Sequence, residues 1–297
     1  MRRRYHILDV FTDVPLAGNP LAVVLDSDGL DGAAMQKIAG EFNLSETVFC
    51  APPRDPVNTA SVRIFTPMVE LPFAGHPTIG TAVLLALEKA PDLIAREDVG
   101  LVLEEKIGPV ACSVRRRRGE AAHARFEAPR AAEPCGEPPE PAVLAAKLGL
   151  DVADLGFNGH RPACFTAGNP MIFVPVGSLE ALGRAALAAA PGERVMLYLY
   201  VRADDQAGTR AFRTRMLSAG YGVPEDPATG SAAAAFPAAL AAGDKLGDGE
   251  HDCRLLQGVE MGRPSRLGVA FCIEGGRVGP ATIGGSAVMV ATGTLEL

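Results

Sequence analysis

Two stretches of the chain, about 155 residues apart, carry the same phrase, and this internal repeat constrains the fold more than any other feature of the sequence. Glu70–Ala82 reads ELPFAGHPTIGTA, and Glu225–Ala234 reads EDPATGSAAA. Aligned without a gap, the two stretches share a glutamate, a proline and a glycine, whereas His76 falls opposite Ser231. The repeat predicts one structural unit that is built twice, with different polar side chains at matching positions.

Two further pairs of segments follow in the same order. Leu16–Leu25 reads LAGNPLAVVL and Thr166–Val176 reads TAGNPMIFVPV, at an offset of 150 residues, and each shared AGNP leads into an apolar run typical of a strand. Between these segments, Arg63 falls opposite Arg215 at an offset of 152. Three matches at a nearly constant offset predict two similar halves related by a pseudo-twofold axis.

In each half the repeated phrase opens a helix. Thr78–Lys89 and Ser231–Ala242 read as helices that are apolar nearly all round, which predicts that both are buried. We therefore expect an α+β fold with two pseudo-symmetric domains, each a sheet or barrel wrapped around a central helix. Pro237 lies inside the second helix, where it removes a hydrogen bond and predicts a kink beyond the helix start.

The domain boundaries are predicted from the repeat and from a local change in composition. Ala128–Pro141 reads APRAAEPCGEPPEP and is the clearest linker in the chain. The first domain is expected to comprise residues 1–127 together with a C-terminal strand at about 278–297. The second domain is expected to comprise residues 128–277.

The start of each buried helix is a candidate ligand site. The first N–H groups of a helix have no partner within it and carry partial positive charge, so they attract anions. Gly75 and Gly230 let the backbone approach a ligand closely. If the pseudo-twofold brings the two helix starts together, they face each other across one cleft, which we expect to hold a small carboxylate. The alternative is that both phrases serve only the packing of the helices.

Composition and charge argue against several classes of protein. The 297 residues carry a net charge of −7, which disfavours a nucleic-acid binder, and the basic run Arg115–Arg118 is expected to be a solvated turn between strands. No stretch reaches the roughly 18 apolar residues of a membrane span, and no secretory signal is visible, so a soluble cytoplasmic protein is expected. The six scattered cysteines show no metal-like spacing and are expected to be reduced and packed.

Six segments of the sequence resemble the signature segments of the phenazine-biosynthesis PhzF-like family. They read, in chain order, AGNPLAVVL, NLSETVF, ELPFAGHPTIGTA, GVPEDPATGSAA, QGVEMGRPS and IGGSAV. The resemblance covers nearly the whole chain. It implies the diaminopimelate epimerase fold, in which two pseudo-symmetric domains hold the site between them, and it implies a homodimer.

The resemblance also implies which residues carry the chemistry. The amino-acid racemases and epimerases of this fold use one cysteine at each helix start, and in this sequence Ala74 and Thr229 stand at those positions. Neither side chain can act as a thiolate acid or base. In the PhzF-like family the proton-handling group is a glutamate in the SET segment, here Glu46, which is expected to work with His76 and Asp226.

Further residues are expected to contact the substrate. The resemblance implies this role for Ser231, just after Gly230, while Gly75 and Gly230 form the two helix starts. Asn19 and Asn169 occupy the two AGNP turns, where asparagine is an ordinary turn residue. The fold's epimerases use asparagines in these turns for substrate contact, which makes both of them candidate binding residues.

These observations predict a cofactor-independent isomerase that acts on a small carboxylate. Glu46 would remove a proton from one carbon and return it at another. An epimerase or racemase that uses Glu46 and another group in place of the cysteines is one alternative. A ligand-binding or protein-interaction module that keeps the fold without turnover is the other. No cofactor and no metal ion are expected, because no GxGxxG follows a strand and the sequence lacks metal-ligand spacing.

Overall fold

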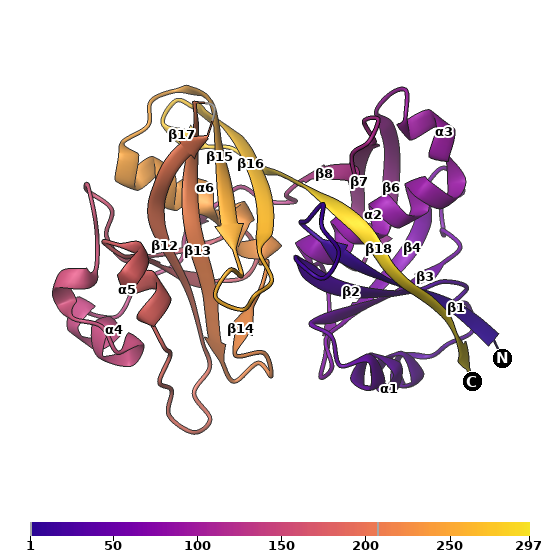
Figure 1. Cartoon of the computed structure of the whole chain (residues 1–297), viewed down its shortest axis with the longest axis horizontal. Coiled ribbons are helices and arrows are strands. Elements are labelled where there is room, and N and C mark those ends of the chain that lie inside the picture. The colour runs from indigo at the N-terminus through magenta and orange to yellow at the C-terminus, as the bar shows by residue number, and fades with distance from the viewer. Residues whose placement is uncertain (1, 207) are drawn as a thin grey trace. The chain divides into compact units, whose positions relative to one another are not determined.

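The computed structural model describes residues 2–206 and 208–297, and its internal contacts divide the chain into two compact units (Figure 1). The first unit comprises Met1–Glu127 and Gly284–Leu297, and the second unit comprises Ala128–Ile283. The last strand of the chain thus returns to the unit that contains the first strand.

The first unit holds the strands and helices up to Glu127 together with the final strand. In chain order these are β1 (Arg2–Val10), β2 (Asn19–Val24), α1 (Gly32–Phe42), β3 (Glu46–Ala51), β4 (Ala60–Phe65), β5 (Glu70–Leu71), α2 (Gly75–Lys89), α3 (Pro91–Ile94), β6 (Val99–Glu105), β7 (Gly108–Arg115), β8 (Ala122–Glu127) and β18 (Thr282–Glu296).

The second unit holds the remaining elements. They are β9 (Glu133–Pro134), α4 (Pro141–Leu148), the 3-10 turn η1 (Val152–Asp154), β10 (Ala163–Thr166), β11 (Met171–Pro175), α5 (Leu179–Arg184), β12 (Val195–Gln206), β13 (Thr209–Ala219), β14 (Glu225–Asp226), α6 (Gly230–Asp244), β15 (Gly249–Gln257), β16 (Ser265–Glu274) and β17 (Arg277–Val278).

Eight strands of the first unit form a closed ring. β1 is antiparallel to β2 and β18, β2 is parallel to β3, β3 is antiparallel to β4, and β4 is parallel to β6. β6, β7 and β8 continue as an antiparallel run, and pairing of β8 with β18 closes the ring. Parallel neighbours need a crossover connection, and α1 supplies it between β2 and β3.

The helix α2 fills the inside of this ring. It contacts β1, β2, β3, β6, β7 and β8, and its residues from Gly75 to Ala86 are all buried. A helix surrounded on every side must be apolar all round, as the sequence of α2 is. Gly80 brings α2 close to the wall, since a side chain there would meet Leu21 and Val10 of β2 and β1 within 2.8 Å.

The second unit repeats the same order of strand pairings. β10 and β11 are antiparallel, β11 and β12 parallel, β12 and β13 antiparallel, β13 and β15 parallel, and β15 and β16 antiparallel. The helix α6 takes the place of α2 and is also buried along most of its length. The repeat in the sequence thus corresponds to a repeat in topology, and the predicted α+β fold with a helix at the centre of each half is confirmed.

The helix α6 is narrow because it is built largely of alanine. It continues as one helix through Pro237, and aromatic side chains of the surrounding strands pack around its one aromatic residue, Phe236. The ring of Phe236 lies 5.1 Å from that of Tyr200 and 5.0 Å from that of Phe212, both in edge-on arrangements. Small residues on the helix are thus offset by large residues on the sheet.

The prediction that all six cysteines are reduced was wrong for one pair. Cys135 and Cys164 form a disulfide with a Cα–Cα distance of 5.3 Å. The segment 128–141, predicted as a linker, contributes β9, which pairs with β10 and sets the two cysteines side by side. The two cysteines are 29 residues apart, and this spacing alone gave no indication that they pair. Cys50, Cys112, Cys253 and Cys272 are free.

The helices of the described residues are all too short or too polar to cross a membrane.

Candidate functional site

The start of α2 brings three of the predicted site residues together. His76 is the second residue of α2 and is 3% exposed, and its Nδ1 lies 3.3 Å from the amide nitrogen of Asn19. The same Nδ1 lies 3.3 Å from Oε2 of Glu46. Asn19 and Glu46 are the first residues of the parallel neighbours β2 and β3, which explains why residues 27 positions apart reach the same imidazole.

The His76 imidazole is neutral. Burial lowers the pKa of His76 to about 3, although a hydrogen bond to the Pro20 carbonyl acts in the opposite direction. This agrees with the expectation that a cationic imidazole is disfavoured at a helix N-terminus. A neutral imidazole carries one proton, on either of its two nitrogens.

The contact between His76 and Glu46 is a close approach and not a formed hydrogen bond. A hydrogen bond between these two atoms would couple the tautomer of His76 to the protonation state of Glu46. An ionised Glu46 would accept from Nδ1–H, whereas a protonated Glu46 would donate to Nδ1 and leave the imidazole proton on Nε2. The amide of Asn19 can turn to present its NH₂ or its oxygen, so it suits both forms.

Glu46 is the member of this cluster that keeps access to solvent. Its side chain is 17% exposed, compared with 4% for His76. A carboxylate in this position can exchange a proton with a bound molecule, while the buried imidazole of His76 can change its tautomer.

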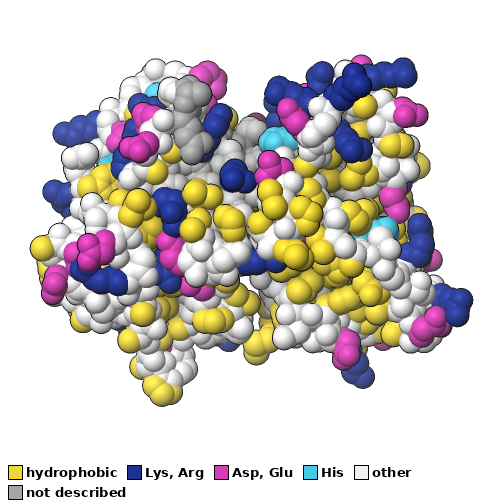
Figure 2. All heavy atoms as spheres, in the orientation of Figure 1, with side chains coloured by type: hydrophobic (Ala, Val, Ile, Leu, Met, Phe, Trp, Pro, Cys, Tyr) yellow, Lys and Arg dark blue, Asp and Glu magenta, His cyan; other side chains and the backbone are white. Residues whose placement is uncertain are grey.

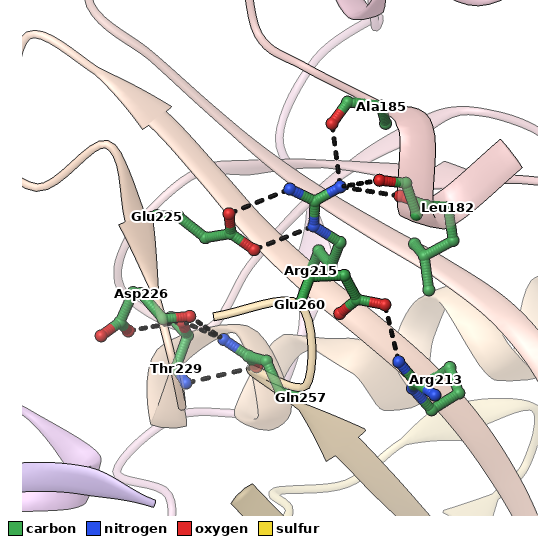
Figure 3. A network of polar contacts seen from close by, with 10 residues as sticks. Leu182, Ala185, Arg213, Arg215, Glu225, Asp226, Thr229, Gln257 and Glu260 are labelled. Carbon is green, nitrogen blue, oxygen red and sulfur yellow. Dashed lines mark hydrogen bonds and ion pairs between the residues drawn. The ribbon is translucent and has the colours of Figure 1, made fainter. Parts of the chain in front are cut away.

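The start of α6 holds a second polar cluster (Figure 3). Thr229 is the residue before the helix, and its hydroxyl donates to the Asp226 carboxylate at 2.6 Å. Gln257 is fully buried and donates to the backbone carbonyl of Asp226 at 2.7 Å and to the Thr229 hydroxyl at 2.9 Å. Its side-chain oxygen accepts from the Thr229 backbone N–H at 3.3 Å. Asp226 is thus held at the helix start by two neighbours.

Neither of these helix starts is capped by a side chain. Asp31 and Ser178 precede α1 and α5, and their side chains accept from backbone N–H groups of the first turn. Ala74 and Thr229, which precede α2 and α6, make no such bond. The first-turn N–H groups of the two buried helices are therefore left to other acceptors, and a carboxylate ligand is one that suits their partial charge.

A matched ion pair fixes the strand that leads into each helix. Arg63 donates from Nε and Nη2 to the two carboxylate oxygens of Glu70 at 2.8 and 3.0 Å. Arg215 donates in the same way to Glu225 at 2.8 and 2.9 Å. Arg63 matches Arg215 and Glu70 matches Glu225 in the repeat, but neither match predicted a role. Arg63 and Glu70 are 7 residues apart, whereas Arg215 and Glu225 are 10 residues apart, so the signal that they belong together was their common order in the two halves and not their spacing.

The remaining predicted residues differ in their surroundings. Gly75 and Gly230 are buried first residues of α2 and α6, and Ser231 is half-buried beside Gly230. Asn169 is exposed, unlike its counterpart Asn19, which is completely buried.

The arginine run has a place of its own. The run Arg115–Arg118 was predicted as a solvated turn, and all four residues are exposed, but Arg115 ends β7 and only Arg116–Arg118 lie in the connection to β8. Basic side chains gather over this end of the first unit (Figure 2). A cavity of about 360 Å³ lies beside the turn, apart from Glu46 and His76. Its lining consists of Asp98, Ser113, Arg115, Arg117, Glu120, Ala121, His123, Arg125 and Ser286.

Comparison with known proteins places this arrangement in a family. A family model described as "Phenazine biosynthesis-like protein" matches residues 8–293. An uncharacterised isomerase of Mesorhizobium japonicum is 46% identical, over 99% of this chain and 98% of the relative. Trans-2,3-dihydro-3-hydroxyanthranilate isomerase of Pseudomonas aeruginosa is 38% identical, over 99% of both chains.

A solved structure agrees with these relatives. The phenazine biosynthesis protein of the PhzF family from Bacillus anthracis superposes with a TM-score of 0.85, at 26% identity and over 100% of both chains. The prediction of an isomerase of this family is therefore confirmed at the level of the family. From the repeated helix starts, the shared topology and these matches over the full length, we conclude that the chain belongs to the phenazine biosynthesis-like protein family.

Proposed function

We propose that the protein is a cofactor-independent isomerase that moves a proton between two carbons of a small carboxylate. The observation that carries this proposal is the contact of Glu46 with the neutral, buried His76, which Asn19 also reaches. A carboxylate with partial access to solvent is a suitable base, and its protonated form is the acid that returns the proton.

The proposed reaction is balanced without any other reactant. The Glu46 carboxylate takes a proton from a carbon of the substrate, and the electron pair moves through the adjacent double bond. Protonated Glu46 then gives the proton to the carbon at the far end of the original double bond, and the new double bond includes the carbon that lost its proton. No electron is gained or lost overall, so no redox cofactor is needed.

The neighbours of Glu46 support this cycle. His76 changes tautomer each time that Glu46 changes protonation state, so the pair avoids a buried charge on the imidazole. We propose that N–H groups at the start of α2 bind the substrate carboxylate, with Gly75 allowing close approach. Asn19 is proposed to orient His76. At the start of α6, Gly230, Ser231 and Asp226 are proposed as residues that contact substrate.

Ala74 and Thr229 support isomerisation over two-base racemisation. A racemase needs an acid and a base on opposite faces of one carbon, and neither side chain can serve as one at neutral pH. A single carboxyl group that both takes and returns the proton works on one face of the substrate. Asn169, which is exposed, is proposed at most to line the approach to the site.

The test uses the substrate named for the relative from Pseudomonas aeruginosa, trans-2,3-dihydro-3-hydroxyanthranilate. Wild type and Glu46→Gln are incubated with it in D₂O, and products are followed by absorbance and mass spectrometry. Turnover in wild type with loss in Glu46→Gln supports the proposal. Equal turnover in both contradicts the role of Glu46. Deuterium at a stereocentre without net isomerisation would identify an epimerase instead.

We also propose that the protein works as a homodimer. Apolar side chains gather on one face of the first unit (Figure 2), and Met289 and Val290 on β18 are 38% and 37% exposed. Light scattering of the purified protein measures the mass directly. A mass of one chain, 30.9 kDa, at micromolar concentration would contradict the dimer.

A further inference from the structure

We propose that Glu105, in its protonated form, is a positioning residue that holds the first turn of α2, and with it His76, in place. This inference rests on the function proposed above and adds to it a residue outside the cluster of Glu46, His76 and Asn19. Glu105 is the last residue of β6, is 2% exposed, and reaches α2 through Thr78.

The geometry around Thr78 determines where the protons lie. Its hydroxyl oxygen is 2.8 Å from the Ala74 carbonyl oxygen and 2.7 Å from Oε1 of Glu105. The hydroxyl has one proton to donate, and a carbonyl oxygen can only accept. When the hydroxyl donates to Ala74, Glu105 must therefore donate to the hydroxyl, which requires a protonated carboxyl.

The protonated form thus builds a directed chain of hydrogen bonds. Glu105 donates to Thr78, and Thr78 donates to Ala74, the residue that precedes Gly75 and His76. If Glu105 ionises, Thr78 must turn its proton toward the carboxylate. Ala74 then loses one of its two bonds in this turn and keeps only the backbone N–H of Thr78.

The surroundings of Glu105 favour the neutral form. Its Oε2 is buried without a hydrogen-bond partner in the part of the chain that the structure describes. Burial raises the pKa of Glu105 to about 8, although the bond to Thr78 acts in the opposite direction. An ionised Glu105 would therefore be shielded from water, with the Thr78 hydroxyl as its one hydrogen-bond donor among the described residues.

The charged and titratable groups nearby do not compensate for that charge. On α2, His76 is neutral. On β7, burial and then the charge of Glu105 raise the pKa of Cys112 to about 12, so it stays a thiol. Beside Glu105 in the chain, Glu104 accepts hydrogen bonds from the loop at Arg54, Asp55 and Asn58, and Lys106 lies 3.5 Å from Glu70.

The second unit shows how the same position works without titration. Gln257 ends β15 as Glu105 ends β6, and positions 105 and 257 are 152 apart, as are Arg63 and Arg215. Gln257 is completely buried and donates to the Thr229 hydroxyl and the Asp226 carbonyl at the start of α6. An amide there is always a donor. Glu105 is a donor only while it keeps its proton.

The consequence is an alkaline limit on the rate. Above the pKa of Glu105 the first turn of α2 loses its hydrogen-bond chain, His76 shifts against Glu46, and proton transfer slows. The substrate carboxylate still has the helix N–H groups, so we expect kcat to fall and KM to stay within about twofold.

The experiment compares Glu105→Gln with Glu105→Ala across pH 6–10. Wild-type kcat is expected to be roughly tenfold lower at pH 9 than at pH 7, as one ionisation near pH 8 requires. Glu105→Gln can donate to Thr78 at every pH, so its ratio of kcat between the two pH values should lie near one. Glu105→Ala should have low kcat throughout, which the glutamine variant restores.

Glu104→Gln is the matched control. It removes the neighbouring carboxylate on β6, which bonds the loop and not α2, so the alkaline limb should remain. An alkaline limb that persists in Glu105→Gln overturns the proposal. So does a glutamine variant that lowers kcat equally at every pH, because that is a purely structural effect.

A second readout does not depend on the substrate. The Hε1 proton of His76 is followed by NMR between pH 6 and 10, where His76 itself does not titrate. A shift with a midpoint near pH 8 in wild type, absent from Glu105→Gln, supports the positioning role even if the proposed reaction proves wrong. No such shift in wild type overturns the role even if turnover is found.

Discussion

The start of α2 and the start of α6 share the same supporting elements but differ in the side chains that surround them. Each is reached through a two-residue strand that a paired arginine and glutamate hold, and each is supported from the end of a matching strand, β6 or β15. At α2 the groups are titratable and mostly buried: Glu46, His76 and Glu105. At α6 the supporting groups, Thr229 and Gln257, have fixed protonation.

This difference indicates that the repeat preserves the positions of the residues that support each helix start, but not whether those residues titrate. A duplicated framework can place a proton-handling cluster in one half and a set of constant hydrogen bonds in the other. In the second half, Thr229 and Gln257 hold Asp226 by hydrogen bonds from groups that do not titrate near neutral pH. The four predictions below test this division, from the largest expected effect to the smallest.

The largest effect is expected for Glu46→Gln, which removes the proposed base and keeps its shape. We expect kcat to fall by about 10³-fold, within the range of general acid–base catalysis. Steady-state kinetics with the substrate of the test above measures it. Glu41→Gln, an exposed glutamate on α1, is the matched control and should leave kcat unchanged. A comparable loss in both variants would refute the assignment.

The second effect concerns the other half of the comparison. Asp226→Asn should lower kcat by about 10²-fold, because the variant keeps a similar size but loses the charge through which Asp226 is proposed to contact the substrate. Thr229→Val removes the hydroxyl that holds Asp226 and should cost about tenfold. If Thr229→Val is the more damaging of the two, the roles assigned at α6 are reversed.

The two ion pairs allow a direct comparison of stability. Arg215 is only 9% exposed and also donates to the carbonyls of Leu182 and Ala185, whereas Arg63 is 38% exposed. Arg215→Met should therefore lower the free energy of unfolding by about 4 kcal/mol. Arg63→Met should lower it by about 1 kcal/mol. Urea denaturation measures both, and equal losses would show that burial does not distinguish the pairs.

The smallest effect is a pH-dependent difference in stability at Glu105. The pKa of Glu105 is raised by folding from 4.5 to about 8, so between these values the folded state binds the extra proton. Its contribution to stability is full below about pH 4.5 and is lost as pH rises toward 8. Glu105→Gln should therefore gain in melting temperature relative to wild type as pH rises from 5 to 8. A constant difference would mean that Glu105 does not titrate in this window.

Much of the fold was predictable from the sequence because the repeat is a long-range signal. Matching phrases at nearly constant offset carry information about topology that local propensity lacks, and helices apolar all round indicate burial directly. The disulfide between Cys135 and Cys164 was not predictable, because β9 has only two residues and lies in a segment of linker composition. Strand pairing, not sequence spacing, brings these cysteines together.

The candidate site was predictable where the repeat or the family resemblance marks it. Glu46, His76 and Asn19 were each named in advance, but only the structure shows that they share one contact at Nδ1 of His76. Glu105 was missed, since a glutamate that ends a strand looks like any exposed terminal residue. The offset of 152 between Glu105 and Gln257 was available, yet only the helix starts reveal what it connects.

The pairing of β1 with β18 has a consequence for how the protein is made. Residues up to Glu127 are translated before the second unit, but the ring that they form closes only when Gly284–Leu297 have been added. Arg2 pairs with Glu296, so β1 cannot pair with β18 until the second unit has been translated. The second unit therefore has all its strands before the first unit does, and a premature stop codon that removes Gly284–Leu297 would damage the unit whose other strands are encoded earlier.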